Sequence, residues 1–286
     1  MLNEPLISVV TVSYRAEKTI EKTIKSVLNQ SYQNIQYVLK DGMSDDRTNL
    51  IINKYEQNFF SRGVSVKHIV EPDHGIYNAM NQALKYCEGE YVIFLNADDV
   101  FYSDNILEEI FSADADYCGA DIIYGDADFV DGEMHFWWKG DINTVKEKCP
   151  FCHQSSFVKT SWMRAHLFDE NLMITADYDF IYKSYIEKAK FYYVNIIISQ
   201  FMRGGASGKY LVKDRIEHRA VQLRYGKNET SINRYLKYYI RITSAFLQEI
   251  LFKYLPESFC VRLRQFSKKK KMRLVKIETN ESVKHD

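Results

Sequence analysis

The sequence lacks any uninterrupted apolar run close to the roughly 18 residues that a membrane-spanning helix requires, so we expect no transmembrane segment. It also lacks net charge, because 38 Lys and Arg residues balance 38 Asp and Glu residues, and this argues against a nucleic-acid-binding protein. Five cysteines, scattered and odd in number, do not indicate a disulfide framework. The first residues contain neither a basic region nor a signal-cleavage site. These absences favour a protein of a reducing, cytoplasmic compartment.

The balance of charge conceals an asymmetry along the chain. From Arg215 onward there are 17 Lys and Arg residues against 7 Asp and Glu residues, a net charge of +10, whereas the first 214 residues carry −10. The hydrophobic content, 46%, is ample for a folded core. We therefore expect an acidic folded body with a basic C-terminal tail.

Short β-branched runs alternate with helical patterns over the first hundred residues, as in a parallel sheet built from βαβ units. Strands are expected at residues 7–14, 35–41, 64–70 and 91–96. Apolar residues recur at helical spacing in two segments between them, at Ile20, Ile24, Val27 and Leu28 and at Ile76, Met80 and Leu84. The pattern predicts an α/β fold with a mostly parallel sheet flanked by helices.

The second half of the chain predicts a hairpin, a helix and a strand, followed by a glycine-rich loop. Asp131-Gly132 has the composition of a hairpin turn, and the helix and strand are expected near residues 178–189 and 191–199. Glycines within residues 203–208 indicate a flexible loop, which we take as the domain boundary. The expected division is a folded domain over residues 1–210 and a helical extension over residues 211–286.

Carboxylates gather where predicted strands end. Asp41 closes the second strand, Asp98 and Asp99 follow the fourth, and Asp126 ends a later one. Ligands of open α/β sheets bind beyond the carboxyl ends of the strands, and oxygen ligands favour hard cations such as Mg²⁺ or Mn²⁺. A divalent cation with a phosphate ligand would offset this negative charge. The alternative is that Asp98 and Asp99 cap the helix beginning near Asn105, or close a turn.

Several segments carry more specific motifs, in a fixed order. They are residues 8–14, 26–32, 41–44, 75–81 and 95–99, joined later by residues 124–126, 153–154, 176–179 and 204–207. Over about residues 5–208 the chain resembles glycosyltransferase family 2, whose members are inverting glycosyltransferases of the GT-A fold. Within that family it is similar to the branch that builds bacterial surface polysaccharides of the colanic acid or capsule type. The resemblance implies a Rossmann-like, mostly parallel sheet and a nucleotide-sugar donor.

The resemblance also implies how a UDP-sugar donor would be bound. Asp41 would accept a hydrogen bond from the uracil N3–H, which suits a carboxylate because a carboxylate can only accept. Glu17 would lie near the nucleoside, Asn96 would bind the ribose, and Arg203 would contact the donor. The alternatives are an ordinary turn at Asp41, a helix-dipole role for Glu17 and a surface ion pair for Arg203.

Asn96-Ala97-Asp98-Asp99 stands where the family has its Asp-x-Asp metal motif, with Asn in the first position. The resemblance implies that Asp98 is the main contact of a Mn²⁺ or Mg²⁺ ion and that Asp99 holds the ion or its water shell. The ion would lie at the donor's diphosphate, where it neutralises the charge that develops on the leaving UDP.

The family's catalytic base lies in an acidic motif that opens a helix, and residues 176–179 match this motif with Ala176 in place of Glu. Asp177 aligns with the base and Asp179 with the acid that follows it. The alternative is that Asp177 only caps the helix. The resemblance places His153, Gln154, Asp126 and Asp179 near the transferred sugar or the acceptor. A structural histidine is the alternative for His153.

Cys149-Pro150-Phe151-Cys152-His153 fits the C-x-x-C-H pattern of c-type haem attachment, and its first four residues resemble a redox pair. Haem attachment requires export, which the N-terminus does not indicate. A redox pair should follow the first strand of a βαβ unit, and zinc would need two further ligands at matching spacing. We therefore set these three interpretations aside.

Apolar residues recur at helical spacing between Ile232 and Tyr254, which predicts a long amphipathic helix. The basic cluster that follows includes the run of lysines at 268–271, and such clusters attract anionic lipids. Contact with the inner face of the cell membrane is one interpretation. Packing on the catalytic domain, a seam between copies of a homo-oligomer and a solvated basic end are the others.

We therefore expect an inverting, metal-dependent transferase that moves one sugar from a UDP-sugar to a saccharide acceptor, lipid-linked, in surface-polysaccharide assembly. Processive members of the family have membrane spans and a Gln-x-x-Arg-Trp motif, and this chain shows neither. A sugar-nucleotide nucleotidyltransferase is the alternative enzyme, but residues 13–17 are not a glycine-rich phosphate loop. A non-catalytic scaffold would be favoured by loss of the acids, and these are all present.

Overall fold

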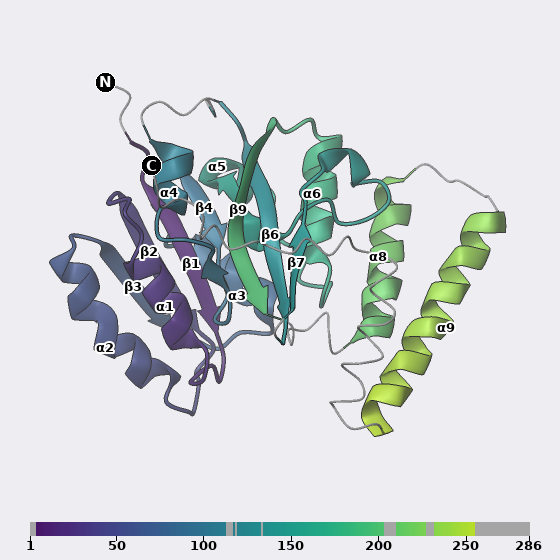
Figure 1. Ribbon diagram of the computed structural model, residues 1–286, viewed down its shortest axis with the longest axis horizontal. Coiled ribbons are helices and arrows are strands. Elements are labelled where there is room, and N and C mark those ends of the chain that lie inside the picture. Colours follow the sequence, from purple (N-terminus) through teal and green to yellow (C-terminus); the bar gives the residue numbers. More distant parts are fainter. Residues whose placement is uncertain are drawn as a thin grey trace, which may run out of the picture.

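The computed structural model describes residues 4–112, 117, 119–132, 134–202, 210–226 and 232–254. Within these residues nine strands form one sheet in the order β3-β2-β1-β4-β8-β6-β9-β5, and β7 pairs with β6 (Figure 1). The strands are β1 (Ile7–Ser13), β2 (Ile35–Asp41), β3 (Ser65–Val70), β4 (Tyr91–Phe94), β5 (Val100–Phe101), β6 (Ile122–Asp131), β7 (Met134–Trp138), β8 (Ser156–Lys159) and β9 (Phe191–Met202).

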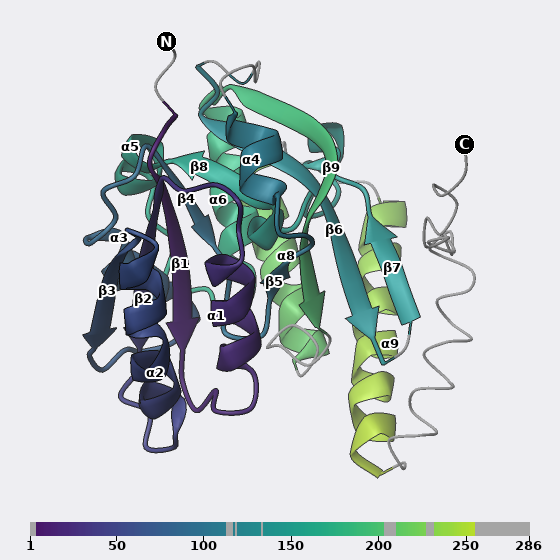
Figure 2. The ribbon, with the colours of Figure 1, turned by 60° about the vertical axis from the view of Figure 1, so that its left-hand side comes forward.

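Helices lie on both faces of this sheet. They are α1 (Ile20–Leu28), α2 (Thr48–Ser61), α3 (Ile76–Leu84), α4 (Ile106–Phe111), α5 (Thr160–Ala165), α6 (Ala176–Ile186), α8 (Leu211–Tyr225) and α9 (Ile232–Tyr254), with the short 3₁₀ helices η1 (Ile142–Thr144) and η2 (His153–Ser155). The predicted α/β fold is therefore confirmed, but the sheet is mixed and not mostly parallel. The pairs β1–β2, β1–β4, β2–β3 and β6–β9 are parallel, whereas β5, β7 and β8 join the sheet through antiparallel pairs. Figure 2 shows α1 and α2 on one side of β1 and β2.

Parallel pairing brings the carboxyl ends of several strands to one edge of the sheet. β1 pairs in parallel with β2 and β4, and Ser13 stands opposite Asp41 at the ends of β1 and β2. β8 runs antiparallel to both β4 and β6, so β6 again points the same way as β4. β4 ends at Phe94, two residues earlier than predicted, and the chain then turns at Asn96, whose carbonyl accepts from the amides of Asp98 and Asp99.

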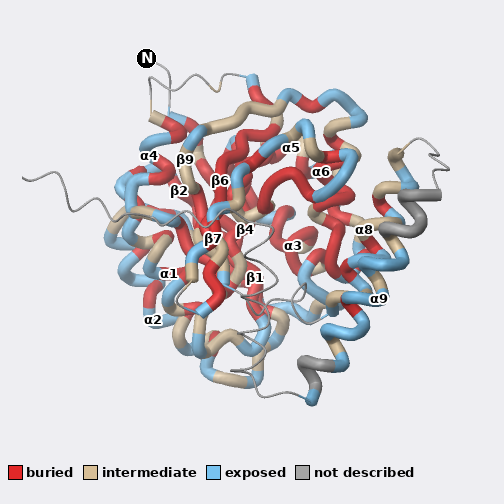
Figure 3. Tube along the Cα trace, turned by 45° about the vertical axis from the view of Figure 1, so that its right-hand side comes forward, coloured by how far each residue is buried: buried red, intermediate tan, exposed pale blue. Residues whose placement is uncertain are grey.

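Alternate residues of the strands enter two separate cores, one on each face of the sheet. Val9 packs with the buried faces of α1, α2 and α4. Val10, its neighbour, packs on the opposite face with α3 and α6. Figure 3 shows this buried interior continuing through the strands and into α3 and α6, while α9 is mostly exposed or half-buried. The predicted apolar faces of residues 20–28 and 76–84 are confirmed by these contacts.

The second half of the chain also follows the predicted order of elements. β6 and β7 form the hairpin, and Gly132 adopts φ 69°, a value that glycine tolerates best. α6 begins two residues before the predicted helix, and β9 extends to Met202. The glycine-rich loop and the lysine run at 268–271 lie outside the described residues.

The extension begins with two helices that pack beside the sheet domain. α8 contacts α6 on one side and α9 on the other, and both lie at the right-hand end of Figure 1. α9 confirms the predicted helix over residues 232–254. No helix in the described part of the chain is long and apolar enough to cross a bilayer. The division of the chain at residue 210 stays a prediction.

Candidate functional site

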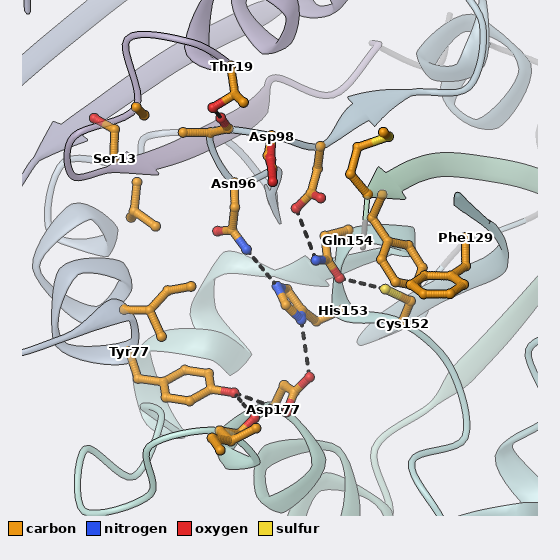
Figure 4. A pocket seen from close by; sticks show the side chains of 18 of the residues that line it. Ser13, Thr19, Tyr77, Asn96, Asp98, Phe129, Cys152, His153, Gln154 and Asp177 are labelled. Atoms are coloured by element: carbon orange, nitrogen blue, oxygen red, sulfur yellow. Dashed lines mark hydrogen bonds and ion pairs between the residues drawn. The ribbon is translucent and has the colours of Figure 1, made fainter. Parts of the chain in front are cut away.

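A cavity of about 660 Å³ opens beyond the carboxyl ends of β1 and β4. Its wall combines the end of β1, the turn after β4, η2, the start of α6 and one face of α8. Figure 4 shows Asn96 and His153 between Asp98 and Asp177. Six of the predicted site residues line this cavity: Asn96, Asp98, Asp99, His153, Gln154 and Asp177. Segments more than 80 residues apart in the sequence thus meet at one cavity.

The turn after β4 presents oxygen atoms toward the cavity. Asp98 and Asp99 close this turn and do not cap α4, which begins at Ile106 after Asn105. The Oδ1 atom of Asn96 is buried and has no hydrogen-bond partner among the described residues. Such an atom is costly unless a ligand or water pairs with it. The turn therefore carries an acceptor suited to a bound molecule.

Asp99 is a buried carboxylate whose charge the protein compensates poorly. Burial raises its pKa to about 7, although a hydrogen bond from Gln154 Nε2 to Oδ2, at 3.0 Å, acts in the opposite direction. A cation beside Asp99 would favour the ionised form. The described residues contain no cluster of three or more His, Cys, Asp and Glu side chains that could hold a metal alone. Asp98 and Asp99 fit Mg²⁺ or Mn²⁺ if water or a diphosphate completes the coordination shell.

A hydrogen-bonded chain connects this turn to the start of α6. Asn96 Nδ2 lies 3.3 Å from His153 Nε2, and His153 Nδ1 lies 3.1 Å from Asp177 Oδ2. An ionised Asp177 can only accept, so this arrangement puts the imidazole proton on Nδ1 and lets Nε2 accept from the Asn96 amide. Tyr77 donates to Asp177 Oδ1 at 3.2 Å from the other side. The Asp177 carboxylate is thereby held in one orientation.

Asp177 stays ionised despite its burial. Burial alone would raise its pKa, but the hydrogen bond from His153, together with that from the Tyr178 amide, outweighs this effect and lowers the pKa below its usual value. Asp177 Oδ1 accepts from the Tyr178 amide at 2.8 Å. Asp177 therefore accepts from a backbone amide at the start of α6 and also lines the cavity. His153 is similarly both hydrogen-bonded and cavity-lining.

Asp41 lies outside the lining of the cavity. It is fully buried, and its carboxylate accepts from the Ser13 hydroxyl, the Ser44 amide and hydroxyl, and the Asn49 side chain. These contacts hold the loop that begins at Gly42. A direct hydrogen bond from the uracil N3–H to Asp41 would have to replace one of them, so this role stays a prediction.

Other predicted residues also make contacts away from the cavity lining. Asp126 accepts from Gly140, Trp137 and Tyr193, and joins β6 to its neighbours. Asp179 is buried and pairs with Arg224 of α8 at 2.7 Å. Glu17 accepts from the Arg47 amide beside the cavity rim. Arg203 lies outside the described residues.

A second cavity, of about 540 Å³, adjoins the first and shares Val12, Ser13, Tyr14 and Ile76 with it. Gly42 and Asp73 line its other side. Asp73 accepts from the buried Lys40 ammonium at 2.8 Å, so its position is set by an ion pair that is shielded from water. Asp73 was not among the residues predicted from the sequence, although a polar residue soon after the third strand was a usable signal.

The sequence analysis also missed two side chains that α8 adds to the main cavity. Asp214 and His218 stand one helical turn apart, with Oδ1 and Nδ1 3.3 Å from each other. Burial acts to lower the pKa of His218, but the contact with Asp214 outweighs it and raises the pKa. His218 stacks on Tyr178 of α6 with ring centroids 5.0 Å apart. The sequence signal for this pair was an acid followed four residues later by a histidine.

Cys149 and Cys152 also line the cavity and are free thiols. Burial raises the pKa of both thiols well above the usual value, so neither is a reactive thiolate at neutral pH. Cys152 donates to Gln154 Oε1 and so fixes the amide that contacts Asp99. Both cysteines therefore serve the packing of the cavity wall.

Comparison with known proteins identifies the family. Residues 8–205 match the family model described as glycosyl transferase family 2. The chain belongs to this family. It is therefore a glycosyltransferase, and its fold is the GT-A fold that the motifs implied.

Sequence relatives of this glycosyltransferase include two proteins with named pathways. A PGL/p-HBAD biosynthesis glycosyltransferase of Mycobacterium bovis is 24% identical over 227 residues, which cover 78% of this chain and 87% of the relative. The putative teichuronic acid biosynthesis glycosyltransferase TuaG of Bacillus subtilis is 36% identical over 107 residues, which cover 37% of this chain and 41% of the relative.

Solved structures with the same fold are more distant in sequence. The S. aureus TarS 1-349 structure in complex with UDP-GlcNAc has a TM-score of 0.59 at 18% identity, covering 87% of this chain and 73% of that one. The mannosyltransferase PcManGT from Pyrobaculum calidifontis, in complex with GDP-Man and Mn²⁺, has a TM-score of 0.62 at 14% identity, covering 93% and 80%. These two similarities concern the fold.

The raised pKa of Asp99 predicts a pH-dependent stability for the metal-free protein. The folded carboxyl has a pKa of about 7 and keeps its proton up to that pH, whereas the ordinary pKa of Asp is 3.8, so this group removes stability as pH rises between those values. In EDTA, we expect Asp99→Asn to unfold at a higher temperature than the wild type at pH 8, with a smaller difference at pH 5. Thermal unfolding measures this, with the exposed Asp104→Asn as control. An equal difference at both pH values would contradict the assignment.

Proposed function

We propose that this glycosyltransferase is an inverting, metal-dependent enzyme that moves one sugar from a UDP-sugar to a saccharide acceptor in surface-polysaccharide assembly. The observation that carries the proposal is the meeting of two groups in one cavity. Asp98 and Asp99 form an oxygen-rich turn suited to a cation and a diphosphate, and an ionised Asp177 lines the same cavity. The teichuronic acid relative and the UDP-GlcNAc complex of TarS support the choice of pathway and donor.

The nucleoside of the donor would occupy the smaller cavity. Tyr14 is 58% exposed there and offers an aromatic face for a base. Asp41 would act on this cavity mainly by holding the loop at Gly42, and Asp73 is the carboxylate that lines it. Asn96, with its buried unpaired Oδ1, would accept from a ribose hydroxyl. Glu17 at the rim and Arg203 would complete the contacts to the donor.

The transfer step needs charge compensation on one side of the sugar and a base on the other. A Mn²⁺ or Mg²⁺ ion held by Asp98 and Asp99 would offset the negative charge that develops on the leaving UDP. Asp177 accepts the proton of the acceptor hydroxyl while the oxygen of that hydroxyl bonds to the anomeric carbon and the bond to UDP breaks. His153 keeps Asp177 ionised and oriented, and Gln154 keeps Asp99 in place.

The acceptor would enter along the wall formed by β6, β9 and α8. Phe129 and Phe201 lie side by side with ring centroids 5.0 Å apart and their planes tilted by 49°, and they provide apolar surface for the face of a sugar ring. Asp214 and His218 add a hydrogen-bond acceptor and donor for its hydroxyls. Asp126 and Asp179 would support this wall through their contacts to Trp137 and Arg224.

We further propose a cytoplasmic enzyme whose extension, residues 211–286, docks on the anionic inner face of the membrane to reach a lipid-linked acceptor. Several large apolar side chains of α9 are exposed: Tyr239, Ile240, Phe246, Leu247, Ile250 and Tyr254. The basic sequence that follows α9 provides charge attraction to anionic lipid. Packing between two copies of α9 is the competing use of this face.

Metal-dependent donor binding is the first test. UDP should bind more tightly with Mn²⁺ than in EDTA, and Asp98→Ala should remove the metal-dependent part and weaken binding at least about tenfold, because a cation ligand is lost. Isothermal titration calorimetry of UDP with and without Mn²⁺ measures this, with Asp104→Ala as the control. Binding that is equally tight in EDTA would refute the metal site.

Removal of the base separates binding from chemistry. Asp177→Asn should leave UDP affinity close to that of the wild type and reduce turnover by about 10²- to 10⁴-fold, the usual contribution of general base catalysis. Turnover is measured as the release of UDP, after a panel of UDP-sugars has been screened to find the donor. Asp141→Asn is the matched control, because Asp141 also accepts from a backbone amide at a helix start but lies outside the cavity. Turnover retained in Asp177→Asn would mean that the base lies elsewhere.

Membrane docking predicts a salt-sensitive association with anionic lipid. Sedimentation with phosphatidylglycerol-containing vesicles should decrease as salt rises and after Lys268, Lys269, Lys270 and Lys271 are changed to Gln, because screening and charge loss both weaken the attraction. Phosphatidylcholine vesicles serve as the control. If neither salt nor the substitutions change the bound fraction, the electrostatic part of the proposal fails.

A further inference from the structure

Glu217 of α8 is a buried carboxylate that binds the backbone just before α6. Its side chain accepts from the amides of Met173, Ile174 and Thr175 at 3.0, 2.8 and 3.2 Å. The residue is only 7% exposed, and its nearest cation, Lys213 Nζ, is 3.9 Å away. Three amide donors to one carboxylate form a strong, charge-assisted contact that defines the position of the loop.

This contact fixes the three residues that lead into α6. The N-cap residue Thr175 makes no side-chain capping bond of its own. Glu217, on a neighbouring helix, instead satisfies the amide of this N-cap residue and the two amides before it. Asp177 is the second residue of α6, so the loop held by Glu217 sets where its carboxylate lies.

Tyr77 of α3 holds the same loop from the opposite direction. Its hydroxyl lies 2.6 Å from the Ile174 carbonyl and 3.2 Å from Asp177 Oδ1. Ile174 therefore has its amide held by Glu217 and its carbonyl held by Tyr77. Since Met173 and Ile174 also line the cavity, a shift of this loop would change both its wall and the orientation of Asp177.

The remaining contacts of α8 keep Glu217 in register with α6. His218 stacks on Tyr178, and Arg224 pairs with Asp179 at 2.7 Å. These contacts join α8 to α6 at successive turns. Yet α8 follows the end of the segment that matches the family model, residue 205.

We propose that Glu217 is a positioning residue for the transfer step, which holds residues 173–175 so that Asp177 faces the acceptor hydroxyl. The inference rests on the proposed role of Asp177. In this role α8, the first helix of the extension, contributes to the transfer step in addition to any role in membrane docking. Disruption of the Glu217 contact should therefore reduce turnover without weakening donor binding.

The test compares Glu217→Gln with the wild type in the full-length chain. The amide group of Gln replaces one accepting oxygen with a donor, which cannot pair with the backbone amides. We expect unchanged UDP affinity and donor KM, and a kcat for UDP release that falls by about tenfold to a hundredfold, as for a displaced catalytic group. Hydrogen exchange at the amides of residues 173–175 should become faster. Glu217→Asp, which keeps the charge, should recover part of the kcat.

Glu249→Gln is the matched control. Glu249 of α9 accepts from the Val212 amide at 2.9 Å, so it too is a glutamate that holds a backbone amide of another segment, but it lies outside the cavity. Its substitution should leave kcat unchanged. A Glu217→Gln protein with wild-type kcat, or one in which only the melting temperature falls, would overturn the positioning role. If the wild type itself releases UDP from no UDP-sugar, the proposed function fails and this inference fails with it.

Discussion

Compensation of buried carboxylate charge is the constraint on which this structure depends. An acid taken out of water must be neutralised, hydrogen-bonded or paired. Asp41 accepts from Ser13, Ser44 and Asn49, Asp179 pairs with Arg224, and Asp177 accepts from His153 and Tyr77. Asp99 is left with a pKa of about 7, and the oxygen-rich turn that holds it therefore favours a cation. The two acids of the cavity thus differ, because the protein itself compensates the charge of Asp177 and leaves that of Asp99 to a ligand.

The same constraint connects the extension to the sheet domain. Glu217 is stable in its buried position because three backbone amides face it, and those amides need an acceptor because the loop before α6 provides none. The Glu217 carboxylate and the three amides therefore satisfy each other's need for a hydrogen-bond partner where α8 packs on α6. Asp214 and His218 then reach the cavity from the same face of α8. A helix outside the matched family segment thus contributes to the wall of the site.

Much of the architecture could be predicted from local patterns. β2 has the predicted bounds, and the helices at residues 20–28 and 76–84 present the expected apolar faces, because alternation and helical spacing report burial directly. Six of the site residues that were predicted from the motifs line one cavity. The pattern could not show that Asp41 and Asp126 would be surrounded by donors of their own chain, since those donors come from Ser13, Asn49 and Tyr193.

The sequence by itself determined the family, the α/β fold and the carboxylates where strands end, because these follow from short segments read in order. Only the tertiary structure decided which carboxylates face the cavity and which face the protein. It also joined Glu217 to amides more than 40 residues earlier in the chain. The physical reason is that burial and hydrogen bonding depend on what surrounds a side chain in space, and packing between distant segments sets those surroundings.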